Sequence, residues 1–292
     1  AKVDFVDIDP LTYNLCPKAL KKKLIYAKQA GKLPKIVIPV HFGGQSCDMK
    51  AIYVLSKEFN FKIIEDASHA IGGKYLNEPV GNCKYSDITV FSFHPVKIIT
   101  TGEGGMALTN NHRIAEQLSL LRSHGITRNP SQMTEEPHGD WYYQQVDLGF
   151  NYRMTDIQAA LGVSQLARLD NYVSRRHELA ARYDKLLKKL PLITPYQGSD
   201  SYSAFHLYII RLRDNNKHKQ IFDYLRRENI GVNLHYIPVH MQPYYSRMDT
   251  GYIDLEQAEL YYKDAISIPL FPAMTELEQE YVVDSLRKAF HI

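Results

Sequence analysis

The residues that could do chemistry lie where two apolar stretches of the sequence end. Asp66 follows one such stretch, with His69 three positions later. Lys97 follows the other, five positions after Ser92. A lysine attacks a carbonyl carbon only as a neutral amine, so burial or a nearby positive charge must lower its pKa. A carboxylate, in turn, can keep a facing ring nitrogen protonated. An amine and a carboxylate at neighbouring strand ends could meet both needs.

Each of these residues has a simpler interpretation when taken alone. A lysine after a strand is usually a solvated surface residue, and an aspartate there usually caps the next turn. Ser92 could be an ordinary polar strand residue or a phosphate ligand, and a single histidine such as His69 is more often structural than catalytic. The glycines of residues 102–105 most often form a tight turn. Together, the lysine and the carboxylate could meet the needs of pyridoxal phosphate as cofactor.

The first half of the chain alternates predicted strands and helices, which positions these residues. Apolar or alternating runs predict strands at residues 3–8, 35–40, 61–65 and 88–93. Pro17 and Gly31 bracket one helix, and Asp48 can cap the next. Strands separated by helices of about a dozen residues indicate an α/β fold with a mostly parallel sheet and helices on both faces. Ligands bind at the carboxyl ends of such strands, where Asp66 and Lys97 are expected.

The second half predicts a smaller α+β unit. A helical stretch begins near Met154, with Ile157 and Leu161 on the same face, and reaches about residue 190 before two prolines. Beyond it we expect strands at residues 205–212 and 232–235, a helix at 218–228 and a final helix. A capping box of Thr275 and Glu278 opens the final helix, whose apolar side is predicted to carry Leu277, Tyr281, Leu286 and Ala289. The predicted domains are residues 1–172 and 173–292.

Composition narrows the classes of function. The chain has 292 residues and a net charge of 35 − 32 = +3, which does not favour nucleic acid or an acidic membrane surface as partner. It has no apolar run near the length that a membrane helix needs. Cys16, Cys47 and Cys83 fit no zinc or redox spacing and are expected to be reduced thiols in the cytoplasm. No dinucleotide fingerprint, P-loop or credible metal set is present in the sequence.

Several motifs, in order along the chain, resemble the DegT/DnrJ/EryC1/StrS family of sugar aminotransferases. They are EDASHAIG (residues 65–72), DITVFSFHPVK (87–97), GEGG (102–105), LRSHG (121–125), GFNYRMTDIQAA (149–160) and HYIPVH (235–240). The resemblance spans most of the chain. It implies a fold-type I pyridoxal-phosphate transferase with a large cofactor-binding domain and a smaller C-terminal domain.

The resemblance also implies roles for single residues. Lys97 would bind the cofactor covalently and move the proton, and Asp66 would pair with the pyridine nitrogen. Ser92 would bind the phosphate, and His69 would lie beside the ring and its phenolic oxygen. Asn151 would reach the cofactor phosphate of a neighbouring subunit, which requires a homodimer. The candidate substrate contacts are Arg153, His235, Tyr236 and His240; for the last three, a polar loop packed on the small domain is an equal alternative.

The motifs most resemble family members of pseudaminic acid biosynthesis. They imply that glutamate donates the amine, leaving 2-oxoglutarate, and that a UDP-linked 4-keto-6-deoxy-N-acetylhexosamine accepts it. A dTDP-linked or 3-keto sugar is an alternative substrate. A sugar dehydratase of the same fold replaces the lysine with histidine, whereas Lys97 is present here.

The resemblance predicts a further segment before residue 1. Family members normally carry about a quarter more chain there, with a phosphate loop and an aromatic residue that stacks on the cofactor. We therefore expect this chain to be truncated at its N-terminus, which puts its own activity in doubt. A non-catalytic sugar-nucleotide-binding or regulatory protein is the corresponding alternative.

Overall fold

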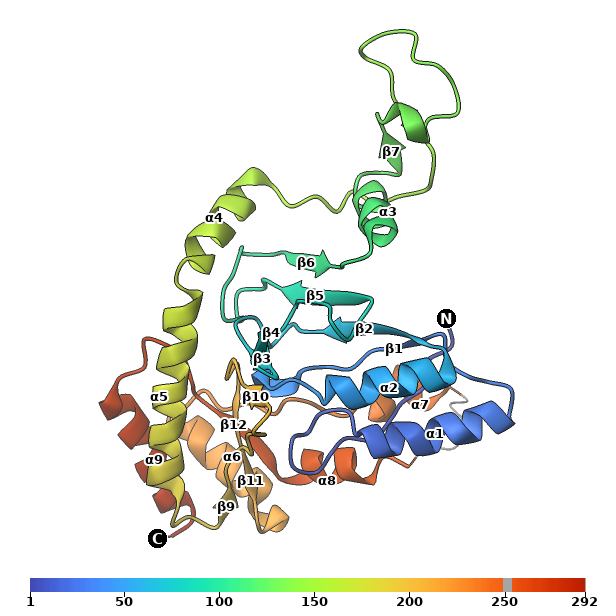
Figure 1. The fold of residues 1–292 in the computed structure, drawn as a ribbon. Helices are drawn as coiled ribbons and strands as arrows, with labels where there is room; N and C mark the ends of the chain where they lie inside the picture. Colours follow the sequence, from blue (N-terminus) through green and yellow to red (C-terminus); the bar gives the residue numbers. More distant parts are fainter. Residues whose placement is uncertain (249–253, 292) are drawn as a thin grey trace.

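The central sheet of the molecule is mostly parallel. Figure 1 shows the fold in a computed structural model that describes residues 1–248 and 254–291. The strands follow the order β1-β2-β5-β6. They are β1 (Ile36–Val37), β2 (Lys62–Asp66), β5 (Ile88–Ser92) and β6 (Gly105–Leu108). The first three are parallel to one another, and β6 is antiparallel to β5. The predicted α/β class is confirmed.

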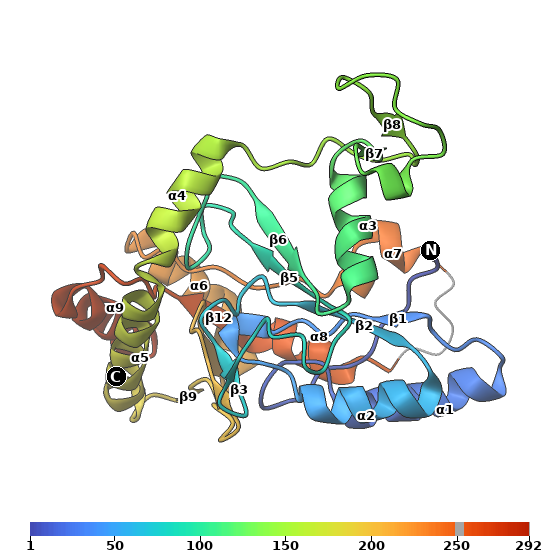
Figure 2. The same ribbon diagram turned by 45° about the horizontal axis from the view of Figure 1, so that its top comes forward.

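Helices α1 (Pro17–Gln29) and α2 (Met49–Phe59) lie side by side below the sheet in both ribbon views (Figures 1 and 2). Their apolar sides and strands β1 and β2 share one core, which includes Leu20, Leu24, Ile52 and Ile63. Each helix begins where the sequence predicts. Pro17 occupies the first turn of α1, and the Asp48 side chain accepts a hydrogen bond from the Ala51 N–H at the start of α2.

A second, antiparallel sheet forms the C-terminal part of the molecule, in the order β12-β11-β9. Its strands are β9 (Leu192–Ile193), β11 (Tyr208–Leu212) and β12 (Ala265–Ile268). Helices α5 (Leu169–Leu187), α6 (His218–Arg227) and α9 (Glu276–Ala289) contribute apolar side chains to its core. The predicted boundary near residue 172 falls at the beginning of α5 and stays a prediction.

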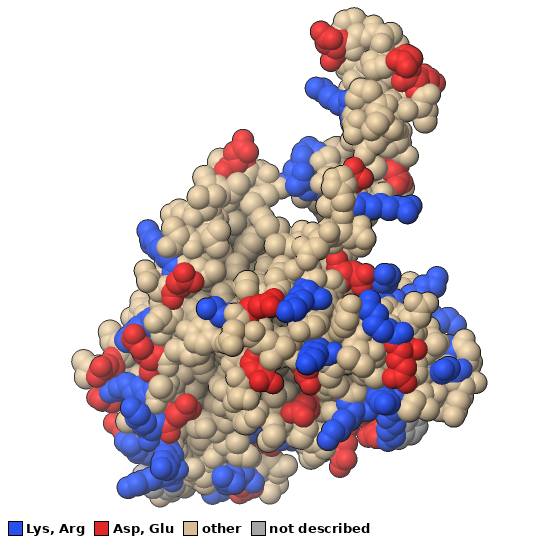
Figure 3. Space-filling model, in the orientation of Figure 1, with Lys and Arg blue, Asp and Glu red and all other residues tan. Residues whose placement is uncertain are grey.

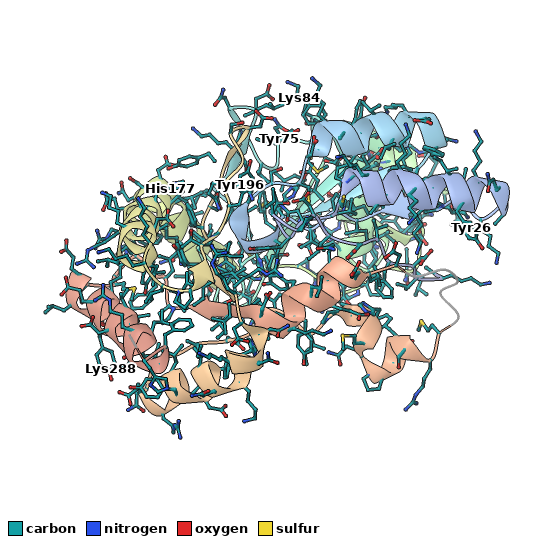
Figure 4. The ribbon with its side chains drawn as sticks, turned by 90° about the horizontal axis from the view of Figure 1, so that it is seen from below. Tyr26, Tyr75, Lys84, His177, Tyr196 and Lys288 are labelled. Atoms are coloured by element: carbon teal, nitrogen blue, oxygen red, sulfur yellow. The ribbon has the colours of Figure 1, made fainter. Side chains whose placement is uncertain are left out.

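The other elements connect these two sheets or project from them. They are helices α3 (His112–Arg122), α4 (Asp156–Leu166), α7 (Pro243–Ser246) and α8 (Glu256–Asp264), and strands β3 (Lys74–Tyr75), β4 (Glu78–Pro79), β7 (Ile126–Thr127), β8 (Gln144–Gln145) and β10 (Ser201–Tyr202). Strand β10 pairs with β3, which ties the two halves of the chain together. Tyr75 of β3 lies near α2 and donates a 2.8 Å hydrogen bond to Asp48 (Figure 4).

Two predicted strands are wrong. Residues 3–8 are irregular apart from one bridge between Ile8 and Leu15, because no strand among the described residues lies beside them to pair with. The Asp7 carboxylate instead accepts hydrogen bonds from the first N–H groups of α8, at Gln257 (2.9 Å) and Ala258 (3.0 Å). Residues 232–235 likewise make only one bridge, between Asn233 and Ser267.

Two helical predictions also need correction. The stretch from residue 154 to 190 is not continuous: α4 ends at Leu166, and α5 begins at Leu169. In α9 the capping box of Thr275 and Glu278 is present. Its predicted apolar side is wrong in part, because Leu277 and Tyr281 are 77% and 49% exposed. The helix buries the predicted Leu286 and Ala289 together with Val282 and Val283.

The segment between α3 and α4 projects from the body as an arm (Figures 1 and 2). We use "the arm" for residues 123–155, which include the short hairpin β7–β8. Blue and red side chains are interspersed over the face in Figure 3, so neither charge sign dominates it. Among the described residues, no helix combines the length and apolar character needed to cross a membrane. Cys16, Cys47 and Cys83 are free thiols.

Candidate active site

Asp66 and Lys97 meet because β2 and β5 are parallel neighbours. Asp66 is the last residue of β2 and pairs in register with Val90 of β5. Lys97 follows β5 in a turn that its own N–H closes on the His94 carbonyl oxygen at 2.9 Å. The Asp66 Oδ1 accepts the Ser68 N–H at 3.0 Å. The carboxyl ends of two adjacent strands thus present a carboxylate and an amine at one edge of the sheet, as the sequence predicts.

The surroundings of Lys97 disfavour its positive charge. Burial lowers the pKa of the Lys97 amine, and the negative charge of Asp66 opposes that effect without cancelling it. A larger fraction of the amine is therefore neutral at a given pH than for a solvated lysine. A neutral amine is the nucleophilic form that carbonyl chemistry requires. Lys97 is partly buried, in contrast to an ordinary solvated lysine.

His69 lies at the centre of a cluster of rings beside this pair. Its Nδ1 accepts the Gly43 N–H at 3.3 Å, and its Nε2 lies 3.4 Å from the Tyr236 hydroxyl. Burial, with the nearby charge of Lys97, lowers the pKa of His69 to about 3, although Asp66 opposes the shift. His69 is therefore neutral throughout the physiological range. We use "the ring cluster" for Phe42, His69, His206 and Tyr236, whose rings lie between 4.4 and 6.3 Å from the His69 ring.

His206 and Phe42 belong to this cluster but were not predicted from the sequence. Residues 204–207 run beside the 3-10 helix η1 (Phe42–Gly44), with the Ala204 N–H on the Gly44 carbonyl at 2.9 Å. His206 is buried, and burial together with His69 and Lys97 lowers its pKa to about 2. The only available signal was a histidine at the start of a predicted strand. About 160 residues of chain separate it from η1, and no local pattern reveals that contact.

His235 and Tyr236 reach the same site from the C-terminal half. The His235 Nδ1 lies 2.8 Å from the Ser267 hydroxyl, and burial and Lys97 lower the pKa of His235. Burial, with the charge of Asp66, raises the pKa of Tyr236. Both residues therefore interact electrostatically with the amine–carboxylate pair. His240 does not join them: its Nε2 pairs with Glu259 at 3.1 Å, and its ring packs on Phe5.

Ser92 lies close to Lys97 in the chain, and its side chain is partly buried at the end of β5. Its hydroxyl lies 3.5 Å from the His94 N–H. Asn151 and Arg153 lie in the arm, where both are exposed. No hydrogen bond, ion pair or ring contact joins either arm residue to the Asp66–Lys97 pair within the described parts of the chain. In those same parts, no group of three or more His, Cys, Asp or Glu side chains could hold a metal ion.

Comparisons with known proteins show which family the sequence matches. The profile of the DegT/DnrJ/EryC1/StrS aminotransferase family matches residues 1–287. The UDP-4-amino-4,6-dideoxy-N-acetyl-beta-L-altrosamine transaminase of Campylobacter jejuni is 37% identical over 289 residues, with 98% of this chain and 73% of the relative covered.

Solved structures of sugar aminotransferases have a fold similar to that of this chain. PseC of Helicobacter pylori, an aminotransferase involved in the biosynthesis of pseudoaminic acid, superposes with a TM-score of 0.87 at 28% identity, covering 98% of this chain and 73% of that one. The PLP-form of the sugar aminotransferase Spr1654 from Streptococcus pneumoniae gives 0.84 at 27% identity, covering 100% and 76%.

Proposed function

Since the chain belongs to the DegT/DnrJ/EryC1/StrS aminotransferase family, whose members are pyridoxal-phosphate-dependent sugar aminotransferases, we propose that it aminates C4 of a UDP-linked 4-keto-6-deoxy-N-acetylhexosamine with glutamate as the donor. The observation that carries the proposal is the Asp66–Lys97 pair at the ends of β2 and β5. The named activity of the Campylobacter jejuni relative supports the choice of sugar. The product would serve pseudaminic acid or another surface polysaccharide.

The residues at this edge of the sheet suit pyridoxal phosphate. Bound there, the cofactor supplies a carbonyl carbon for amines and a ring that accepts electrons. Lys97 brings an amine of lowered pKa, and Asp66 brings a carboxylate for a protonated ring nitrogen. Ser92 brings a hydroxyl for the phosphate, and the neutral His69 lines the ring cluster. In the transfer, the Lys97 Nζ would hold and release the proton that moves when the amino group changes carbon.

The substrate would enter from the side of the site that the C-terminal half provides. We propose His235 and Tyr236 as sugar-nucleotide contacts, because both lie beside the Asp66–Lys97 pair. His240 and Arg153 would contact more distant parts of the substrate. A dTDP-linked or 3-keto sugar stays the alternative, because one hydroxyl changes few contacts in such a pocket.

A second copy of the chain would complete the site. Apolar side chains of the arm and α4 are exposed, among them Trp141 (71%), Leu148 (83%) and Ile157 (84%). Exposed apolar surface of this extent is typical of a protein interface. A homodimer formed there would let Asn151 reach the partner's cofactor phosphate, as the family resemblance implies. The three free thiols support a cytoplasmic location.

The test is a panel of UDP- and dTDP-linked 4-keto and 3-keto sugars, assayed with glutamate and pyridoxal phosphate. We expect amine transfer to the UDP-4-keto sugar and an absorbance band of covalently bound cofactor. Both should disappear in Lys97→Ala, because no other amine of lowered pKa faces Asp66 in the described residues. Lys84→Ala, which removes a surface lysine paired with Glu78, is the control (Figure 4). A Lys97→Ala protein that absorbs like wild type would refute the site, and turnover of dTDP-sugars alone would refute the substrate.

A further inference from the structure

Three groups from distant parts of the chain form a line of hydrogen bonds beside Lys97. The Gly43 N–H in η1 lies 3.3 Å from the His69 Nδ1. The His69 Nε2 lies 3.4 Å from the hydroxyl of Tyr236. The second distance is at the long end of hydrogen bonding, and such contacts often shorten only when a site is filled. The line connects the backbone of η1 to the hydroxyl of Tyr236, a partly exposed residue.

The Gly43 N–H determines which atoms donate and which accept in the rest of the line. A backbone N–H can only donate, so the His69 Nδ1 must accept, and the single ring proton is then at Nε2. That Nε2–H points at the Tyr236 oxygen, which accepts it. The Tyr236 hydroxyl proton is then left to donate to a group outside the line.

The surroundings of His69 keep that direction fixed. Its ring faces the other members of the ring cluster, and the charged or titratable groups around it are Asp66, Lys97, His206 and His235. Burial and Lys97 lower the pKa of His69 to about 3, so a second ring proton does not bind near neutral pH. The raised pKa of Tyr236 keeps its hydroxyl protonated. Its side chain is 53% exposed, which leaves the hydroxyl room for a ligand.

We propose that Tyr236 donates a hydrogen bond to an oxygen atom of the ligand bound over Asp66 and Lys97, and that Gly43 and His69 orient this donor. His69 then positions this donor through its Nε2. The inference rests on the proposed placement of cofactor and sugar at this edge of the sheet. The accepting oxygen belongs either to the cofactor or to the keto sugar, which share this acceptor chemistry.

The direction of the line can be tested without any cofactor. Long-range ¹H–¹⁵N NMR of the cofactor-free protein should show His69 as the Nε2–H tautomer, with no titration between about pH 6 and 8. A Nδ1–H tautomer, or a ring that titrates in this range, would overturn the proposed direction. This readout does not depend on whether Lys97 binds the cofactor, so it can fail while the proposed function stands.

The donor role is tested with Tyr236→Phe, which removes only the hydroxyl. If the acceptor is on the cofactor, the dissociation constant of pyridoxal phosphate should rise about tenfold. If it is on the sugar, the sugar KM should rise by a similar factor while cofactor binding is unchanged. Tyr244→Phe is the matched control, because Tyr244 is 70% exposed in α7 and contacts only Tyr245 among the described rings. An unchanged dissociation constant together with an unchanged KM would refute the donor role.

A double-variant series tests whether His69 acts through Tyr236. His69→Gln keeps one acceptor and one donor, so the effect of Tyr236→Phe should persist in that background. His69→Leu removes both, so adding Tyr236→Phe should then have little further effect. Equal effects of Tyr236→Phe in all three backgrounds would show that His69 does not orient the hydroxyl.

Discussion

At the scale of single residues, the surroundings of the site determine the protonation of its amine and its imidazoles. Burial lowers the pKa of Lys97, and the negative charge of Asp66 raises it in part. The imidazoles of His69 and His206 are kept neutral by burial and by the amine. The Lys97 amine and the Asp66 carboxylate therefore lie beside uncharged rings.

Replacing the Asp66 carboxylate should shift the pKa of Lys97 in a definite direction. Asp66→Asn should lower the pKa of Lys97 further, because among the described residues it removes the one interaction that raises it. The measurement is the pH dependence of Lys97 acylation in the cofactor-free protein, read by mass spectrometry, and the midpoint should move to lower pH. Asp87→Asn is the control, since Asp87 pairs with Lys62 just before the start of β5. A midpoint that moves upward would contradict the assigned contact.

The sequence predicts the Asp66–Lys97 pair but not the contacts of the rings that surround it. Asp66 and Lys97 could be placed because each follows a strand with a clear apolar pattern, and parallel strands end at one edge. The HYIPVH motif points to His235 and Tyr236, but a motif says nothing about the contact of Tyr236 with His69. His206 and Phe42 meet only through tertiary packing, for which neither residue has a local signal. His240 was named in the same motif as Tyr236, but its side chain points to Glu259.

At the scale of elements, the site depends on a seam between η1 and residues 204–207. The Ala204 and Leu207 N–H groups donate to the carbonyls of Gly44 and Gly43. A buried pair holds the residue just before η1: the His41 Nε2 lies 2.7 Å from the Glu65 carboxylate. Burial alone would raise the pKa of Glu65, but its hydrogen bonds from His41, Ser86 and Thr89 lower it instead. The loop that donates to His69 is therefore held on two sides.

The seam has room for glycine only. In Gly44→Ala the new Cβ would lie 2.7 Å from the Phe205 nitrogen, and φ is +108°. We expect the free energy of unfolding to fall by about 3 kcal/mol. Gly31→Ala is the matched control: its φ is +65°, but no atom lies within 4 Å of the new Cβ. It should cost about 1 kcal/mol. Urea unfolding of both variants measures the difference, and equal losses would show that the seam is not tightly packed.

Local signals explain which elements could be predicted. The caps at Asp48 and Thr275 were correct because a cap is made within one helical turn. Residues 3–8 alternate like a strand, but a strand also needs a partner, and Asp7 caps α8 instead. The predicted face of α9 failed at Leu277 and Tyr281 because the packing of α5 and α6 selects the side that is buried. Such choices depend on neighbours that the sequence of one helix does not specify.

At the scale of the whole molecule, the neutral histidines make stability depend on pH. In the unfolded chain His69 and His206 should have a pKa near 6.5, whereas in the native protein burial lowers these values to about 3 and about 2. Below about pH 6.5 the unfolded chain therefore binds protons that the native chain does not. Stability is full above this pH and is lost as the pH falls.

The expected loss is about 2 kcal/mol between about pH 7 and 5.5, with both histidines contributing. Urea unfolding at a series of pH values measures it. His206→Phe, which keeps a ring next to His69, should remove about half of the slope. A free energy of unfolding that is flat over this interval would mean that the two imidazoles titrate in the native protein as they do in the unfolded chain.

The seam between η1 and residues 204–207 also sets the order in which a newly made chain can mature. Translation delivers Asp66 and Lys97 in the first third of the chain, whereas His206 and Tyr236 emerge only after residue 200. A nascent chain that ends before them has the amine, the carboxylate, Phe42 and His69, but it lacks the other two rings of the ring cluster. Completion of the site therefore follows synthesis of the C-terminal sheet.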